Sequence, residues 1–282
     1  MQNKSRLFGK REQSERTKVK LETDKMLADI DDGIGWVTFN HPARRNAISL
    51  EMWDGLATIL ETFQADDAVR VVVLKGAGEQ AFVSGADISE FDTKRSTAAQ
   101  KETYAKTMSA ANRWLAKIDK PMIAMIQGYC IGGGLAIALS ADIRFATPDS
   151  TFGIPAAKLG LGYEYEGLVR LSQLAGPARA KDIMFSARFI EAEEALRMDL
   201  INHICARDEL ESTVREYASL VATNAPLTVK AAKAAINEGQ KDPGQRDLQA
   251  IRTMIDNCFD SEDYKEGRLA FREKRKPVFK GE

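Results

Sequence analysis

The chain has 282 residues, 44% of them apolar and 29% charged, a composition typical of one large or two modest globular domains. Its 40 Lys and Arg against 41 Asp and Glu exclude a general attraction to nucleic acid, and 3 scattered cysteines with only 2 histidines disfavour disulfide, zinc and histidine-based sites. No apolar run reaches the roughly 20 residues that span a bilayer, so we expect no membrane partner. Together with the charge balance and the few cysteines and histidines, this predicts a cytoplasmic protein without a metal site or a nucleic-acid partner.

The N-terminal part of the chain changes character near residue 25. Residues 1–24 are polar, rich in charge and without a hydrophobic period, which predicts a loose extension. Residues 26–30 and 34–40 are β-prone runs on either side of an Asp-Asp-Gly sequence, which predicts a hairpin. The ordered fold is therefore expected to begin at about residue 25.

The next segments predict alternating helices and buried strands. Ser49 precedes an amphipathic run to about Gln64 with Glu51 in its first turn, the pattern of a capped helix. Residues 88–104 are polar and predict a loop ahead of a helix that ends near Ile118. Short runs of apolar and β-branched residues predict strands at 69–74, 121–126 and 142–146.

The chain beyond Gly176 and Pro177 has a helical pattern. The predicted helices cover about 177–186, 191–198, 207–223, 226–239 and 244–273. Strands and helices alternate before this point, which predicts the α/β class. We therefore divide the chain into an α/β core at residues 25–200 and a helical C-terminal subdomain at residues 201–282.

Two turns rich in glycine follow predicted strands. One lies within residues 81–88 (AFVSGADI), and the other, Gly132-Gly133-Gly134, opens an apolar helix. Glycine lets another group approach the backbone closely, and the first amides of a helix lack internal partners. Either turn alone is explained as well by tight packing. Together they offer two N–H groups suited to holding a developing oxyanion.

With these motifs the chain resembles the crotonase, or enoyl-CoA hydratase/isomerase, superfamily over about residues 26–280. The matching stretches are NHPARRNAIS (40–49), VRVVVLKGAGEQAFVSGADISEF (69–91), KPMIAMIQGYCIGGGLAIALSADIRFATPDSTFGIPAAKLGLG (120–162) and KEGRLAFREKRKPVF (265–279). The resemblance implies a spiral of β-β-α turns followed by helices that build a homotrimer, often a hexamer made of two trimers. It also implies an acyl-CoA substrate, with coenzyme A as part of the substrate and no tightly bound cofactor.

The resemblance assigns roles to individual residues. The oxyanion amides carry over to Ala86, which follows the glycine of SGAD, and to Gly133, the middle glycine of GGG. The contacts with coenzyme A carry over to the side chain of Arg45 near the phosphates, to backbone groups of Ser84, Ala86 and Ile88, and to Phe271 and Lys274 reaching a neighbouring subunit's ligand.

The catalytic carboxylates depart from the pattern of the superfamily. Its hydratases use two glutamates, and the corresponding positions here are Ala136 and Ala156. Hydration needs one group to activate water and another to deliver a proton, so the usual two-glutamate hydration is disfavoured. Similarity to dienoyl-CoA isomerases, 4-chlorobenzoyl-CoA dehalogenases and 3-hydroxyisobutyryl-CoA hydrolases places Glu164 at the acyl end of the pocket, as a candidate general acid or base.

The segment around Glu164 leaves several assignments open. Glu166 is the rival carboxylate, Tyr163 or Tyr165 could donate a hydrogen bond, and a plain surface loop is the competing interpretation. In an extended loop, the two glutamates would point to one side and the two tyrosines to the other.

Three functions are compatible with these motifs. The first is an enoyl-CoA hydratase/isomerase-type lyase or isomerase that uses an enolate-like oxyanion. The second is an acyl-CoA thioester hydrolase, in which Glu164 activates water or attacks the acyl carbon. The third is a catalytically silent protein that binds coenzyme A. The sequence does not reveal which acyl group is bound.

Overall fold

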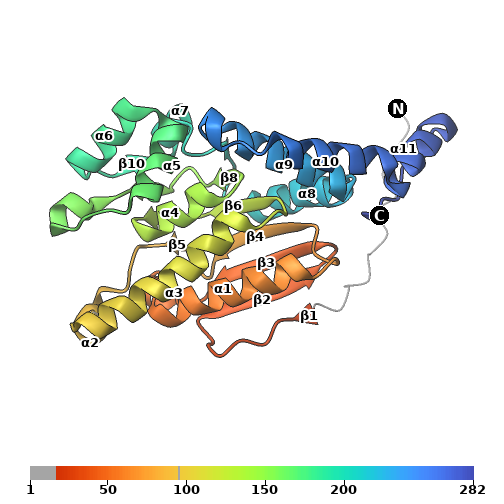
Figure 1. Ribbon diagram of the computed structural model, residues 1–282. Coiled ribbons are helices and arrows are strands. Elements are labelled where there is room, and N and C mark those ends of the chain that lie inside the picture. The colour runs from red at the N-terminus through yellow and green to blue at the C-terminus, as the bar shows by residue number, and fades with distance from the viewer. Residues whose placement is uncertain (1–16, 95) are drawn as a thin grey trace, which may run out of the picture.

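The computed structural model describes residues 17–94 and 96–282, which form two sheets and the helices around them (Figure 1). The larger sheet has the order β1-β2-β3-β4-β6-β8-β11 and the smaller one β10-β9-β7-β5. The larger sheet consists of β1 (Thr17–Lys18), β2 (Met26–Asp31), β3 (Ile34–Phe39), β4 (Val71–Gly76), β6 (Met122–Ile126), β8 (Ile143–Ala146) and β11 (His203–Ile204). The smaller consists of β5 (Ala81–Val83), β7 (Tyr129–Ile131), β9 (Thr151–Gly153) and β10 (Ile190–Glu191).

Consecutive strands alternate between the two sheets. The pairs β4 and β5, β6 and β7, and β8 and β9 each give one strand to the larger sheet and the next to the smaller. Both stacks are parallel in this region, so each strand pair is one turn of a spiral. The predicted spiral of β-β-α turns is therefore present in the chain.

The helices surround this spiral, and the last of them extend to one side of the molecule (Figure 1). They are α1 (Leu50–Ala65), α2 (Phe91–Lys94), α3 (Ala98–Lys117), α4 (Gly133–Ser140), α5 (Tyr165–Ala175), α6 (Pro177–Ser186), α7 (Ala192–Arg197), α8 (Leu210–Ala222), α9 (Pro226–Gly239), α10 (Leu248–Asp260) and α11 (Glu262–Glu273). Short 3-10 turns lie at η1 (Pro42–Arg44), η2 (Ile88–Glu90), η3 (Pro155–Leu159) and η4 (Pro243–Gln245).

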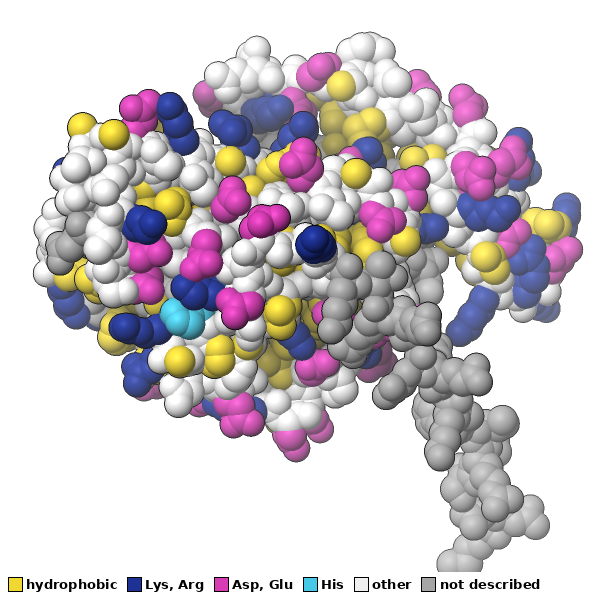
Figure 2. Space-filling view, turned by 90° about the horizontal axis from the view of Figure 1, so that it is seen from below, with side chains coloured by type: hydrophobic (Ala, Val, Ile, Leu, Met, Phe, Trp, Pro, Cys, Tyr) yellow, Lys and Arg dark blue, Asp and Glu magenta, His cyan; other side chains and the backbone are white. Residues whose placement is uncertain are grey.

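Both faces of the larger sheet are covered. Alternate residues of β3 point to opposite sides: Val37 and Phe39 pack in the main core with α1, whereas Ile34 and Trp36 pack under α8. Burial on both faces explains why β4 reads as a continuous run of valines, in which each fully buried side chain contributes roughly 1.5–3 kcal/mol. On the face that Figure 2 shows, acidic and basic side chains are interspersed, as expected for a formal charge of −1.

The N-terminal prediction is only partly testable, because residues 1–16 lie outside the described residues. Within the remaining part of the predicted extension, Thr17 and Lys18 pair with β2 in antiparallel register, and Val19 and Leu21 pack against the core. The prediction of a loose segment is wrong there, since apolar side chains at alternate positions find a sheet edge to cover. The hairpin that follows is confirmed, with Asp31 opposite Ile34.

Two helices differ from the sequence prediction. The polar residues 88–104 form η2, α2 and the start of α3 rather than a loop. Thr97 caps α3 because its side chain accepts from the amide of Gln100, whose side chain in turn accepts from the amide of Thr97. The helix predicted at 244–273 is broken between Asp260 and Glu262 into α10 and α11. The division of the chain at residue 200 stays a prediction.

Candidate active site

The two glycine turns lie side by side because the strands before them are neighbours. Strand β5 pairs with β7 in parallel, with Ala81 opposite Tyr129 and Val83 opposite Cys130. Parallel strands end at the same edge of a sheet, so the chain leaves both strands together. A Cβ built on Gly132 would lie 3.9 Å from the Cα of Gly85. The structure thus brings together the two segments that the sequence singled out.

Glycine is required at this junction by space and by backbone conformation. A Cβ on Gly134 would lie 2.1 Å from the carbonyl oxygen of Val83, a separation that no side chain tolerates. Gly85 has φ of +113°, and Gly132 has φ of +55° with ψ of −118°, conformations that favour glycine. Gly133 differs, because a Cβ there would make ordinary contacts of 3.8 Å with Trp53 and 3.9 Å with Ile48.

The amides of Ala86 and Gly133 have no hydrogen-bond acceptor within the described part of the chain. Ile48 forms a parallel bridge with Ala86: its amide donates to the carbonyl of Gly85 at 2.8 Å, and its carbonyl accepts from the amide of Asp87 at 3.0 Å. In this pairing the amide of Ala86 faces away from Ile48. Gly133 is the first residue of α4, where an amide has no partner within the helix.

One buried and one half-buried arginine support the other end of α4. Arg144, 2% exposed, donates through Nη1 to the carbonyl of Ala141 at 2.6 Å, and Arg170 donates through Nε to the carbonyl of Leu139 at 3.0 Å. Burial, with a smaller contribution from Arg170, lowers the pKa of Arg144 to about 10. Both guanidinium groups satisfy carbonyls at the C-terminal, negative end of the helix. The positive end of the helix lies at Gly133.

Glu164 has an exposed side chain. It is the N-cap residue of α5, and Glu166 is exposed in the first turn of that helix. Because α5 begins at Tyr165, the predicted alternation of an extended loop is wrong. The preceding residue, Tyr163, is anchored: its hydroxyl donates to the carbonyl of Gly132 at 3.2 Å.

The two alanines that replace the hydratase glutamates occupy different surroundings. Ala136 is half-buried on α4, and Ala156 is buried, 6% exposed, in η3. Neither side chain can carry a proton. Acid–base chemistry that used a carboxylate would need one from another segment.

Arg45 lines a hollow beside the SGAD segment. The hollow measures about 310 Å³, and its remaining lining residues are Pro42, Ala77, Gly78, Glu79, Gln80 and Ala81. The guanidinium of Arg45 lies 5.1 Å from the ring centre of Tyr129, and its carbonyl accepts from the amide of Ser84 at 3.2 Å. A cation at this place suits a phosphate group. Ile88, 61% exposed, begins η2 on the same segment.

Phe271 and Lys274 lie apart from these groups. Both are exposed at the end of α11, with Phe271 89% exposed, whereas α4 and β5 lie in the middle of the chain's fold (Figure 1). The structure of one chain therefore does not bring them to the two amides. Their predicted role at a neighbouring subunit's ligand stays a prediction.

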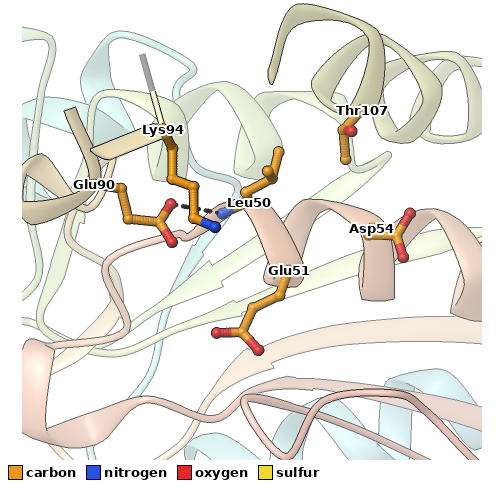
Figure 3. A pocket seen from close by; sticks show the side chains of 6 residues that line it. All are labelled: Leu50, Glu51, Asp54, Glu90, Lys94 and Thr107. Atoms are coloured by element: carbon orange, nitrogen blue, oxygen red, sulfur yellow. Dashed lines mark hydrogen bonds between the residues drawn. The ribbon is translucent and has the colours of Figure 1, made fainter. Parts of the chain in front are cut away.

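A second hollow, of about 470 Å³, lies at the start of α1 (Figure 3). It is lined by Leu50, Glu51, Asp54, Glu90, Lys94 and Thr107. Glu90 accepts from the amide of Leu50 at 2.8 Å. This bond replaces the predicted cap, since the buried hydroxyl of Ser49 has no partner among the described residues. Three carboxylates beside one ammonium group disfavour the phosphates of coenzyme A here.

Two residues near Gly133 were not assigned to this site from the sequence. Trp53 is 4% exposed, and its ring would contact a Cβ at Gly133. Tyr163 was recognised as a hydrogen-bond donor but not with its acceptor. The apolar face of the helix predicted from Ser49 indicates that Trp53 is buried, but no local pattern shows what lies across from either ring.

In residues 17–94 and 96–282, no group of three His, Cys, Asp or Glu side chains is placed to hold a metal ion. Over the same ranges, no helix combines the length and apolar character needed to cross a membrane.

Known proteins match nearly the whole chain. Residues 29–282 match the family described as enoyl-CoA hydratase/isomerase. The chain is 36% identical over 256 residues to the short-chain-enoyl-CoA hydratase of Clostridium acetobutylicum, which covers 91% of this chain and 97% of that protein. It is 32% identical over 253 residues to the carnitinyl-CoA dehydratase of Escherichia coli, covering 87% of this chain and 94% of that one.

Solved structures agree with these sequence matches. The crystal structure of an enoyl-CoA hydratase/carnithine racemase from Magnetospirillum magneticum superposes with a TM-score of 0.85 at 38% identity, covering 93% of this chain and 97% of that one. The enoyl-CoA hydratase from Bacillus anthracis gives a TM-score of 0.86 at 30% identity, covering 92% and 100%.

Proposed function

The chain belongs to the enoyl-CoA hydratase/isomerase family and has the crotonase fold, and we propose that it transforms acyl-CoA thioesters through an enolate-like oxyanion held by two backbone amides. Coenzyme A enters as part of the substrate, and no tightly bound cofactor takes part. We place the reaction in the cytoplasm. The reaction class is that of a lyase or isomerase.

The free amides of Ala86 and Gly133 are the observation that carries this proposal. They come from adjacent segments, and neither has an acceptor within the described chain. The positive end of α4 adds to the attraction for negative charge. When the thioester carbonyl gains charge, two donors already in place stabilise it, and losing one such donor typically costs about 3–4 kcal/mol.

Glu164 is the proposed general acid or base. As a base it would take a proton from the α-carbon; the C–H electron pair would form the Cα–C double bond, and the carbonyl π pair would move to the oxygen. Returning the proton at the γ-carbon of a 3-enoyl thioester then gives the 2-enoyl isomer. With Ala136 and Ala156 in place of the usual glutamates, the reaction does not follow the two-glutamate hydration. Glu166, also exposed nearby, is the competing carboxylate.

The coenzyme A part of the substrate is proposed to lie along the SGAD segment. Arg45 would pair with its phosphates, while backbone groups of Ser84, Ala86 and Ile88 contact the adenine and pantetheine. The hollow that Arg45 lines, together with Glu79 and uncharged residues, supports this placement because Arg45 supplies a positive charge there. Phe271 and Lys274 would come from a neighbouring subunit in a homotrimer or hexamer assembled through the C-terminal helices.

Two other functions make different predictions. A thioester hydrolase would use Glu164 to activate water or attack the acyl carbon, releasing free thiol. A silent protein would bind acyl-CoA without reaction, and the two alanines are the feature that favours it.

One set of reactions separates these three. The purified protein is incubated in D₂O with butyryl-CoA, 2-butenoyl-CoA and 3-butenoyl-CoA. We expect deuterium at the α-carbon of butyryl-CoA and conversion of the 3-enoyl to the 2-enoyl thioester, without free thiol. Thiol release without α-exchange would favour the hydrolase, and binding of all three without exchange or turnover would favour the silent protein.

A further inference from the structure

The hydroxyl of Tyr163 bonds to the peptide unit that supplies one of the two free amides. It donates to the carbonyl oxygen of Gly132 at 3.2 Å. The carbon of that carbonyl is bonded to the nitrogen of Gly133. In a trans peptide the C=O and N–H groups point in opposite directions in one plane. A bond that fixes the carbonyl of Gly132 therefore fixes the direction of the Gly133 N–H.

This peptide has unusual freedom to rotate. It joins two glycines, and glycine populates both signs of φ about equally. Gly132 is held at φ +55° and ψ −118°, at the very start of α4. Its carbonyl also accepts from the amide of Ala136 at 3.0 Å, so the Tyr163 hydroxyl is the second donor on the same oxygen. Two bonds to one carbonyl also polarise the peptide, which strengthens its N–H as a donor.

The ring of Tyr163 is held firmly enough to act as a clamp. It packs against the main core, and Gly167, the third residue of α5, leaves it room: a Cβ there would lie 3.0 Å from Cε1 of the ring. Burial raises the pKa of Tyr163 to about 12, so the hydroxyl keeps its proton across the working pH range. The neighbouring Tyr165 lacks these restraints and is 75% exposed.

We propose that Tyr163 is a positioning residue that orients and polarises the Gly132–Gly133 peptide, so that the Gly133 amide points at the thioester oxygen. This inference rests on the proposed function, because it gives that amide an oxyanion to hold. It also couples two parts of the site: the residue that sets the amide precedes Glu164, the candidate acid or base. The identity of residue 163 would then adjust the rate by altering the strength of the amide donor.

The test compares Tyr163→Phe with Tyr165→Phe, which removes a hydroxyl two residues away from an exposed ring. Each protein binds butyryl-CoA labelled with ¹³C at the thioester carbonyl, and the infrared stretch of that carbonyl is recorded. Relative to unbound butyryl-CoA, we expect wild type and Tyr165→Phe to lower the carbonyl stretching frequency equally. Tyr163→Phe should lower it less. Turnover in Tyr163→Phe should fall roughly 3- to 10-fold with KM unchanged.

A second variant, Gly167→Ala, keeps the hydroxyl but pushes on the ring, and it should give an intermediate frequency. A frequency in Tyr163→Phe equal to that of wild type overturns the inference. If bound butyryl-CoA shows no lowering even in wild type, the proposed function itself fails, so the two failures are distinguishable. Loss of turnover with a lower melting temperature but an unchanged frequency would mean that Tyr163 is only structural, and this too overturns the inference.

Discussion

The amide segments and the carboxylate segment of the candidate site are built differently. Around Val83 and Gly134 the backbone is so closely packed that not even a Cβ fits. In the carboxylate segment, Glu164, Tyr165 and Glu166 are all exposed, and Tyr163 alone of residues 163–166 is half-buried. In the proposed account, the fold of one chain thus fixes where an oxygen would be held, while the proposed acid–base group, Glu164, is exposed at the start of α5. In the same account, Tyr163 links the two parts, because it bonds to Gly132 and directly precedes Glu164.

The largest expected effect tests the carboxylate side. Glu164→Gln keeps the size of the side chain but removes its proton transfer, so turnover of a confirmed acyl-CoA should fall about 10²- to 10⁴-fold. The melting temperature should not change, because the side chain is exposed. Glu166→Gln is the matched control and should keep most activity. The reverse result, with the loss in Glu166→Gln, would move the catalytic role to Glu166.

The packing of the amide side is tested by Gly134→Ala. The added Cβ would meet the carbonyl of Val83, so β5 and α4 must separate, and we expect a loss of about 1–3 kcal/mol in the free energy of unfolding with impaired turnover. Gly133→Ala places the same group one residue earlier, where it finds ordinary contacts. Equal denaturation midpoints for the two variants would show that the junction is not closely packed.

Arg45→Gln tests the coenzyme A end of the amide side. Without the cation near the phosphates, KM for acyl-CoA should rise roughly 10-fold while kcat stays unchanged. The difference in KM between Arg45→Gln and wild type should shrink as salt is added, because salt screens a solvent-exposed pair of Arg45 and phosphate. Lys181→Gln, which removes one exposed positive charge from α6, is the control. An equal rise in KM for both variants would indicate only a general effect of charge.

The smallest effect concerns Asp87, which follows the amide of Ala86. Burial opposes ionisation, but bonds from the hydroxyl and amide of Ser89, with Arg44 nearby, hold the pKa of Asp87 below its usual range. A lowered folded-state pKa stabilises the protein at pH above the ordinary value of about 4, and this contribution disappears as the pH falls through the folded-state pKa. Asp87→Asn should therefore lose less than about 1 kcal/mol at pH 7, since the group is screened by solvent.

Urea denaturation at several pH values measures this contribution. The difference between wild type and Asp87→Asn should be constant from pH 7 to about pH 5 and vanish in stronger acid. A difference that grew as the pH fell would reverse the assigned direction of the pKa shift.

Local patterns predicted the elements that form by local rules. The Asp-Asp-Gly turn between β2 and β3, the apolar helix after Gly132 and the helices at Pro177 and Pro226 all lie where turn and helix signals place them. The start of α3 carries the signal of a capping box, Thr97 with Gln100. The prediction of a loop at residues 88–104 rested on their polarity and overlooked this signal. The start of α5 had no such signal, because the Glu164 side chain forms no cap bond.

Contacts between distant segments were beyond sequence reasoning. Tyr163 meets Gly132 across 31 positions of the chain, and Trp53 meets the same glycine run from α1. Both contacts depend on how the turns of the spiral stack, which no local period encodes. The family resemblance selected the two amide residues, but the register of β5 with β7 is what brings their segments together.

The central claim is most directly tested by replacing Gly133 with proline. Proline is tolerated at the first position of a helix, where it removes the N–H, fixes φ and adds a ring. Gly133→Ala, the matched control, keeps the N–H and adds a Cβ that fits. We predict that Gly133→Pro loses about 10²- to 10³-fold in kcat while still folding and binding acyl-CoA, and that Gly133→Ala stays near wild type. Undiminished turnover in a folded Gly133→Pro protein would contradict the account.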